Sequence, residues 1–201
     1  SNPDWFEYDY NGRCDHKISL EDIQSPNWEG QYLSPNHPNV NEYLLKLVAE
    51  LVQNYPSLYG VHFDYIRFQN QYFGFNPIGI NRFVVEHGFN PKDIYRGVIS
   101  EKFGWSEAQK DSMKDMLIDF NSSNISNFLY EVSKYRNISK IDFKISAAVK
   151  SNILDAKSNW YQDWGEWLKR DIIDFVIPMN YTTNKNDFLN NIKLMNREIN
   201  T

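Results

Sequence analysis

Three short segments rich in β-branched and aromatic residues alternate along the chain with longer segments whose apolar residues recur at helical spacing. The segments that we predict to be strands cover residues 59–68, 142–149 and 172–177. The predicted helices cover 39–54, 80–86, 93–101 and 113–132, with one through Trp160, Trp164, Trp167 and Leu168 and one from Phe188 to Met195. Helices between successive strands are typical of parallel βαβ units, so the sequence predicts an α/β fold.

The strand count limits how much of such a fold this chain contains. Residues 4–10 alternate in part and precede an Asn11-Gly12 turn, which predicts one further, short extended segment. A complete (β/α)8 barrel needs eight strands and about 250 residues. We therefore expect residues 1–201 to form a single but incomplete barrel domain, and the start at Ser1 without an initiator Met indicates a processed form or a fragment.

Composition narrows the function. The 201 residues carry 21 Lys and Arg against 26 Asp and Glu, with no basic stripe, so nucleic acid is a poor partner. The lone Cys14 excludes an internal disulfide framework and, with no Cys/His cluster, argues against a zinc site. No apolar run reaches the roughly 20 residues of a membrane span. We expect no cofactor and no resident metal.

The segment around residues 61–68 carries the best catalytic candidate. The two-residue period of a strand places His62, Asp64 and Ile66 on one face, and Val61, Phe63, Tyr65 and Arg67 on the other. The apolar start of the second face suits helix packing, which leaves Asp64 in the lumen near the carboxyl end, where barrel active sites lie. Two interpretations stay open: Asp64 is catalytic, or it forms a structural pair with His62 or an Arg.

The two later strands provide candidate binding residues. Lys144, Ser146, Ala148 and Lys150 share one face of the second strand, and its small residues leave room for a substrate or for bulky neighbours. Pro178 predicts an end or a bulge in the third strand. Asn180 and Tyr181 then lie at the carboxyl rim, where they can bind a sugar, whereas Asp174 at the strand start is structural.

Aromatic residues are abundant, and most of them have a structural interpretation. Trp160, Trp164 and Trp167 fall on one helical face, which is more typical of core packing than of a sugar platform. Tyr161 and Trp105 are weaker candidates for contact with a sugar.

Four segments in register resemble one protein family. The sequence YGVHFDYIRF at 59–68 resembles the "DGIHFDYIRYP" signature of the glycosyl-hydrolase-like family ten proteins. YLSPNHP at 32–38, KISAAV at 144–149, and YQDWGEWL at 161–168 with IDFVIPMNYT at 173–182 resemble further segments of that family. The chain departs from the pattern at Tyr59, where the family favours Asp, and at Gln69, where it favours Pro.

The resemblance implies a glycoside hydrolase with a (β/α)8 barrel, of which this chain covers about the third to sixth strands with their helices. It carries Asp64, Tyr65 and Arg67 over as motif residues of the site, with His62 beside them. It also implies a carbohydrate substrate and an extracellular, periplasmic or cell-surface location. Together with the rim residues, the predicted substrate-binding set is His62, Tyr65, Arg67, Lys150, Asn180 and Tyr181.

Glycoside hydrolysis requires a second carboxyl group. The sequence offers Asp9, Asp155 and Glu86 as weak candidates, and the family's barrel architecture also allows the partner to lie on a later strand. A poorly solvated Asp64 would have a raised pKa suited to an acid, whereas pairing with Arg67 would favour the ionised form. Both alternatives stay open.

Two rival functions remain at this stage. The first is a carbohydrate-binding module without catalysis, which 13 Tyr, 13 Phe and 6 Trp favour. The second is a metal-dependent hydrolase or deacetylase built on His62 and Asp64 with His87 or His37, for which three ligands in proper geometry are not evident. An incomplete barrel also exposes strand edges, through which we expect self-association.

Overall fold

The computed structural model describes residues 2–17, 29–95 and 104–199. The chain forms two compact units, each built from two stretches of sequence. Unit 1 comprises residues 1–41 and 68–124, and unit 2 comprises 42–67 and 125–201. Among the described helices, none is long and apolar enough to cross a membrane.

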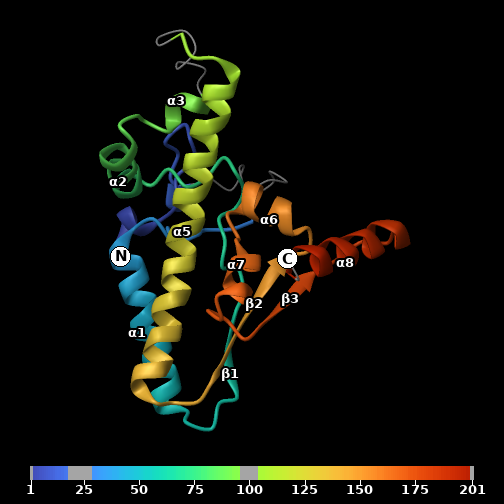
Figure 1. The fold of residues 1–201 in the computed structure, drawn as a ribbon. Helices are drawn as coiled ribbons and strands as arrows, with labels where there is room; N and C mark the ends of the chain where they lie inside the picture. Colours follow the sequence, from blue (N-terminus) through green and yellow to red (C-terminus); the bar gives the residue numbers. More distant parts are fainter. Residues whose placement is uncertain (1, 18–28, 96–103, 200–201) are drawn as a thin grey trace. The chain divides into compact units, whose positions relative to one another are not determined.

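Unit 2 contains a parallel sheet whose strands lie in the order β1, β2, β3 (Figure 1). Their bounds are Gly60–Phe63 for β1, Lys144–Lys150 for β2 and Phe175–Met179 for β3. Gly60 pairs with Lys144, and Ser146 pairs with Phe175. A Cβ at Gly60 would lie 2.5 Å from the Lys144 carbonyl oxygen, which explains why a glycine opens β1. The predicted α/β class, with parallel strands, is confirmed.

The expected strand bounds are partly wrong. β1 ends at Phe63 and not at residue 68, because Tyr65 has the left-handed φ of 53° and turns the chain away from the sheet. Pro178 does not end β3, which continues to Met179. In the part of the chain that the structure describes, β3 pairs on one side only, with β2, and an edge strand tolerates the missing proline N–H.

Helices connect and flank these strands, largely where the sequence predicts them. Their bounds are Pro38–Asn54 for α1, Pro77–His87 for α2, Lys92–Tyr95 for α3, Glu107–Ser139 for α5, Ile153–Trp160 for α6, Trp164–Lys169 for α7 and Lys185–Ile199 for α8. The helix predicted over 93–101 begins as α3, and its part beyond residue 95 lies outside the described residues. The single helix predicted through Trp160 and Leu168 is instead two helices, because Tyr161 adopts a left-handed φ of 57° between them.

The helix-facing side of the sheet forms the core of unit 2. Ile145, Ala147 and Val149 alternate along β2 and are all 0% exposed. Phe63 of β1 packs edge-on against Phe128 of α5, with ring centroids 5.6 Å apart. The prediction that this face of β1 packs on a helix is confirmed.

The tryptophan stripe divides between core and surface. Trp164 and Trp167 of α7 are fully buried, as the core interpretation predicts. Trp167 also donates its indole N–H to the Ser126 hydroxyl at 2.8 Å. Trp160, by contrast, ends α6 and is only half-buried.

Unit 1 has an apolar cluster under α2 and an irregular frame of extended segments. The cluster consists of Phe75, Ile80, Phe83, Leu117 and Phe120. Isolated antiparallel bridges join Phe6 to Leu33, Tyr8 to Cys14 and Asp9 to Phe73. The opening segment is therefore extended only in part, and its Asn11-Gly12 turn is confirmed by a Gly12 φ of 85°.

Glu7 lies fully buried inside this frame. Its carboxylate oxygen Oε2 accepts the Gly74 N–H at 2.8 Å, and its backbone carbonyl accepts the Asp15 N–H at 2.9 Å. Burial raises the pKa of Glu7 to about 8, and the nearby charge of Asp15 adds to this, while hydrogen bonds from Ser34 and Gly74 act in the opposite direction. The folded protein therefore holds Glu7 as a neutral acid at pH 7.

This buried acid makes stability depend on pH. The unfolded chain releases the proton near pH 4.5, whereas the folded protein holds it up to about pH 8. The free energy of unfolding therefore falls as the pH rises between these values, by at most about 1.4 kcal/mol per pH unit.

Glu7→Gln removes this loss and keeps an acceptor for Gly74, so we expect the variant to gain in melting temperature relative to wild type as the pH rises from 4.5 to 8. Thermal melts across this range check it, with the exposed Glu50→Gln as control; an advantage that did not grow with pH would contradict the assignment.

Candidate functional site

The turn at the carboxyl end of β1 holds the main catalytic candidate. Asp64 directly follows β1, is exposed, and accepts the Tyr65 N–H on Oδ1 at 2.8 Å. The Arg67 N–H then closes onto the Tyr65 carbonyl at 2.8 Å. We call residues 64–67 the Asp64 turn. Asp64 therefore lies just beyond the strand and not within it, which corrects the predicted strand bounds, and it lies at the carboxyl end of β1, where the sequence places it.

His62 marks the face of the sheet on which the site opens. Its ring nitrogen Nδ1 lies 2.9 Å from the Ser146 hydroxyl, and the register pairs these two residues across β1 and β2. His62 therefore shares a face with the small residues Ser146 and Ala148, as predicted, opposite the helix-packed Phe63.

Tyr65 and Arg67 lie together beyond this strand end. Tyr65 is 54% exposed, whereas Arg67 is only 5% exposed and places its guanidinium carbon 5.0 Å from the Tyr65 ring centroid. The cation–π contact with Arg67 orients the Tyr65 ring, and much of Tyr65 stays exposed to solvent. An exposed, oriented tyrosine beside a carboxylate can stack against a sugar ring.

The carboxyl end of β2 presents a cation on an aromatic ring. The Lys150 ammonium lies 4.5 Å from the centroid of Trp160. The Lys150 carbonyl accepts the indole N–H of Trp164 at 3.1 Å. The backbone and the side chain of Lys150 are thus both placed by α6 and α7, at the end of the sheet where β1 leads into Asp64.

The end of β3 supplies one anchored and one exposed residue. The Asn180 amide donates to the Phe188 carbonyl at 3.2 Å and accepts from Asn191 at 2.9 Å, so its side chain fastens the strand end to α8. Tyr181, in contrast, is 91% exposed. The structure thus brings Asp64, Tyr65, Lys150 and Tyr181 to the same, carboxyl end of one parallel sheet, as the sequence predicts.

The candidates for the second carboxylate are scattered. Asp9 belongs to unit 1, where it accepts the Arg13 N–H at 2.8 Å and forms an ion pair with the Arg13 side chain. Glu86 is exposed on α2, also in unit 1. Asp155 lies in unit 2, in the first turn of α6, where it is exposed and accepts from Asn159 at 3.0 Å. Asp155 is therefore the candidate that shares a unit with Asp64.

Two further sequence hypotheses can be placed. Tyr161 is 0% exposed, so its interpretation as a sugar platform is wrong, while Trp105 is half-buried in unit 1 and packs on Phe89. The described residues contain no group of three or more His, Cys, Asp or Glu side chains that could hold a metal ion. His37 instead lies near Asp4 and His87 near Glu86, at 3.6 and 3.5 Å.

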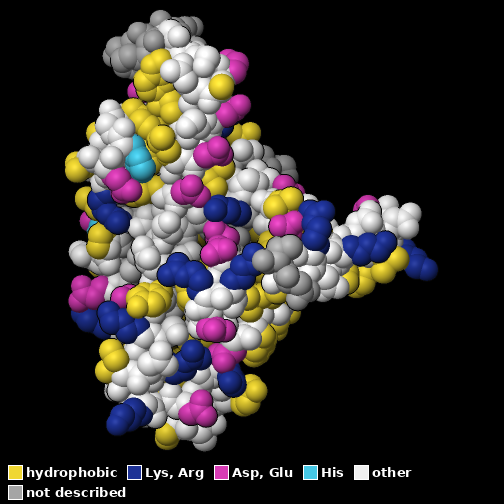
Figure 2. Space-filling model, in the orientation of Figure 1, with side chains coloured by type: hydrophobic (Ala, Val, Ile, Leu, Met, Phe, Trp, Pro, Cys, Tyr) yellow, Lys and Arg dark blue, Asp and Glu magenta, His cyan; other side chains and the backbone are white. Residues whose placement is uncertain are grey.

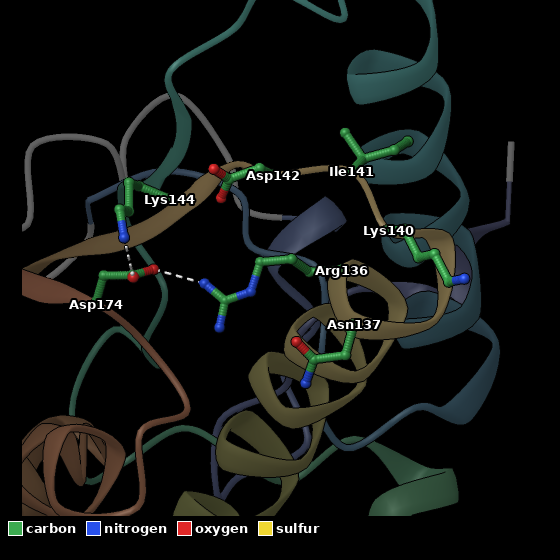
Figure 3. A pocket seen from close by; sticks show the side chains of 7 residues that line it. All are labelled: Arg136, Asn137, Lys140, Ile141, Asp142, Lys144 and Asp174. Carbon is green, nitrogen blue, oxygen red and sulfur yellow. Dashed lines mark hydrogen bonds and ion pairs between the residues drawn. The ribbon is translucent and has the colours of Figure 1, made fainter.

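The opposite, amino end of the sheet contains a pocket of about 370 Å³. Its lining residues are Arg136, Asn137, Lys140, Ile141, Asp142, Lys144 and Asp174 (Figure 3). Asp174 accepts the Ile145 N–H at 2.8 Å and pairs with Arg136 at 2.6 Å and Lys144 at 3.0 Å. These bonds join β2 to the start of β3 and to α5, so Asp174 stabilises the amino end of the sheet, where α/β enzymes do not place their chemistry.

The sequence analysis did not single out Gln162, which is 0% exposed and hydrogen-bonds the backbone of both Lys150 and Ile66. The signal available was its place in the YQDW segment, which carried the family resemblance without a role for the glutamine.

One of three comparisons with known proteins identifies the family of this chain. The family model described as Glycosyl hydrolase-like 10 matches residues 13–199. The chain therefore belongs to the glycosyl hydrolase-like 10 family. Comparison with curated proteins and with solved structures found no match.

The Asp174 ion pairs generate a stability prediction. Burial alone would raise the pKa of Asp174, but the Ile145 N–H, Lys144 and Arg136 together hold it below its usual value near 3.8. The stabilisation is therefore present above pH 4 and is lost as the pH falls through the lowered pKa. We expect Asp174→Asn to lower the free energy of unfolding at pH 7 by about 1 kcal/mol, because solvent screens the pair.

Denaturant unfolding at pH 7 and at pH 3 measures this difference, with Asp142→Asn as the matched control in the same pocket. The loss should be smaller at pH 3 and small for the control at both pH values. An equal loss at the two pH values would show that the ionised carboxylate of Asp174 does not hold the strands.

Proposed function

We propose that this chain is part of a glycoside hydrolase that cleaves a poly- or oligosaccharide, with Asp64 as one of its two reacting carboxyl groups. The observation that carries the proposal is the position of an exposed Asp64 directly after a parallel strand, in a chain of the glycosyl hydrolase-like 10 family. The carboxyl ends of parallel strands are where α/β enzymes place their reacting groups.

The scaffold proposed for this chemistry is an incomplete (β/α)8 barrel in which β1, β2 and β3 are successive strands. The parallel order and the helices between the strands support it. Residues 1–201 then form one barrel domain, and the face shared by His62 and Ser146 is the lumen side.

In this proposal the exposed aromatic residues bind the sugar and the carboxylate acts on the glycosidic bond. Tyr65 and Tyr181 present ring faces for stacking, while Lys150 and His62 supply hydrogen-bond donors. Arg67 holds Tyr65 in place, and Asn180 anchors the β3 end. Asp64 either protonates the leaving oxygen or acts as nucleophile or base on the opposite side of the sugar, and Asp155, the candidate in the same unit, is proposed as the second carboxylate.

The catalytic role of Asp64 has a direct test. Asp64→Asn keeps the shape and an acceptor oxygen for the Tyr65 N–H but cannot exchange a proton or attack carbon, so we expect turnover of a cleaved glycan to fall by about 10²–10⁴-fold. Reducing-sugar release from a panel of polysaccharides measures this. Asp171→Asn is the matched control, because it is an exposed residue of unit 2 with a left-handed φ of 51° that Asn accepts.

A second candidate function is carbohydrate binding without catalysis. The 91% exposure of Tyr181 and the 54% exposure of Tyr65 at one sheet end favour it, since ring faces bind sugars without any reacting group. Binding of a glycan by both wild type and Asp64→Asn, with no cleavage by either, would select this function.

Location and association follow as further parts of the proposal. We propose an extracellular, periplasmic or cell-surface location, and the resemblance to the glycosyl hydrolase-like 10 family is what supports it. Self-association is proposed through the open edge of β3 and the arm of α8, whose exposed apolar side chains include Phe188, Leu189 and Ile192 (Figure 2).

A further inference from the structure

Gln162 lies in the short link between α6 and α7, and its side chain is completely enclosed. Tyr161 before it has a left-handed φ of 57°, and the Gln162 N–H donates to the Ala156 carbonyl at 2.9 Å. These features turn the chain back toward the sheet and point the amide of Gln162 at the end of β2. The residue is 0% exposed, so water does not compete for its hydrogen bonds.

The Gln162 side chain makes three hydrogen bonds to backbone groups. Its oxygen Oε1 accepts the Lys150 N–H at 2.9 Å, and its nitrogen Nε2 donates to the Ala148 carbonyl at 3.1 Å. The second N–H of the same nitrogen reaches the Ile66 carbonyl at 3.2 Å. Because two partners are carbonyls and one is an N–H, only this orientation of the amide satisfies all three.

The bond from Gln162 to the Ile66 carbonyl connects this residue to the Asp64 turn. Ile66 lies within the Asp64 turn, beyond the last ladder pair of β1 and β2, which joins Phe63 to Ala147. The Gln162 side chain therefore continues the connection between the β1 and β2 segments beyond the last backbone pair of the ladder. It ties the turn that carries Asp64 to the strand end that carries Lys150.

We infer that Gln162 is a positioning residue that fixes the Asp64 turn against the carboxyl end of β2. The inference rests on the proposed function for its catalytic meaning, but the connection itself is a property of the free protein. Loss of the amide removes the Gln162 donor from the buried carbonyl of Ala148 and from the partly buried carbonyl of Ile66, so the turn loosens while the ladder and the helices keep their own bonds.

The test replaces Gln162 with Met, which has similar length and no amide. The matched control is Gln53→Met, since Gln53 is exposed in the same unit and donates one bond to the Tyr135 hydroxyl at 2.9 Å. The probes are the amide hydrogens of Tyr65 and Arg67, which are bonded to the Asp64 carboxylate and to the Tyr65 carbonyl. We expect their exchange in Gln162→Met to be about tenfold faster than in wild type, with exchange in β3 and α5 unchanged.

The NMR resonance of the Asp64 carboxyl carbon distinguishes a positioning role of Gln162 from a general stabilising role. The carboxyl carbon resonance of Asp64 should shift in Gln162→Met and stay in place in Gln53→Met. If Gln162→Met does not fold, Gln162→Glu serves instead, because it keeps the acceptor for the Lys150 N–H and leaves at most one donor for the two carbonyls. Unchanged exchange at Tyr65 and Arg67, or equal acceleration throughout unit 2, would overturn the inference.

These outcomes are distinguishable from those for the proposed function. If Gln162→Met speeds amide exchange in the Asp64 turn but the protein cleaves no glycan, the positioning role of Gln162 stands and the catalytic proposal falls. If glycan cleavage depends on Asp64 but exchange in the Asp64 turn does not change in Gln162→Met, the catalytic proposal stands and the positioning role of Gln162 is overturned. Where cleavage is observed, we expect Gln162→Met to lower kcat about tenfold more than it changes KM.

Discussion

The parallel pairing of β2 with both of its neighbours is the constraint on which unit 2 depends. It sets a common direction for three strands, so their carboxyl ends meet at one end of the sheet and their amino ends at the other. Asp64, Lys150 and Tyr181 come from distant parts of the sequence, and only this pairing brings them to the same end. The fully buried Ile145 and Val149 hold β2 in the core and keep that direction fixed.

The two ends of the sheet are held by different chemistry. At the amino end, the carboxylate of Asp174 joins β2, β3 and α5 through ion pairs and a backbone bond. At the carboxyl end, neutral amides make the connections: Gln162 binds β2 and the Asp64 turn, and Asn180 binds α8. Neither Gln162 nor Asn180 adds a charge at the end of the sheet where Asp64 lies, whereas the amino end depends on the ionised carboxylate of Asp174.

Much of this arrangement was predictable from the sequence, for identifiable reasons. Apolar periodicity located the helices and strands, and the two-residue period placed His62 opposite Phe63. The turn at Tyr65 was not predictable, because a left-handed φ at a tyrosine has no compositional signal and the run of aromatic and β-branched residues favours a strand. The same holds for Tyr161 and for the role of Gln162, since a buried amide is recognised by partners that only the fold brings near.

The measurement that tests the central claim most directly is a titration of the isotope-labelled protein with soluble oligosaccharides, followed by NMR. If function lies at the carboxyl end of the sheet, the resonances of His62, Tyr65 and Tyr181 shift with a common dissociation constant. Shifts confined to the opposite end, at Arg136 and Asp142 of the pocket there, would contradict the account, as would the absence of binding by every oligosaccharide tested.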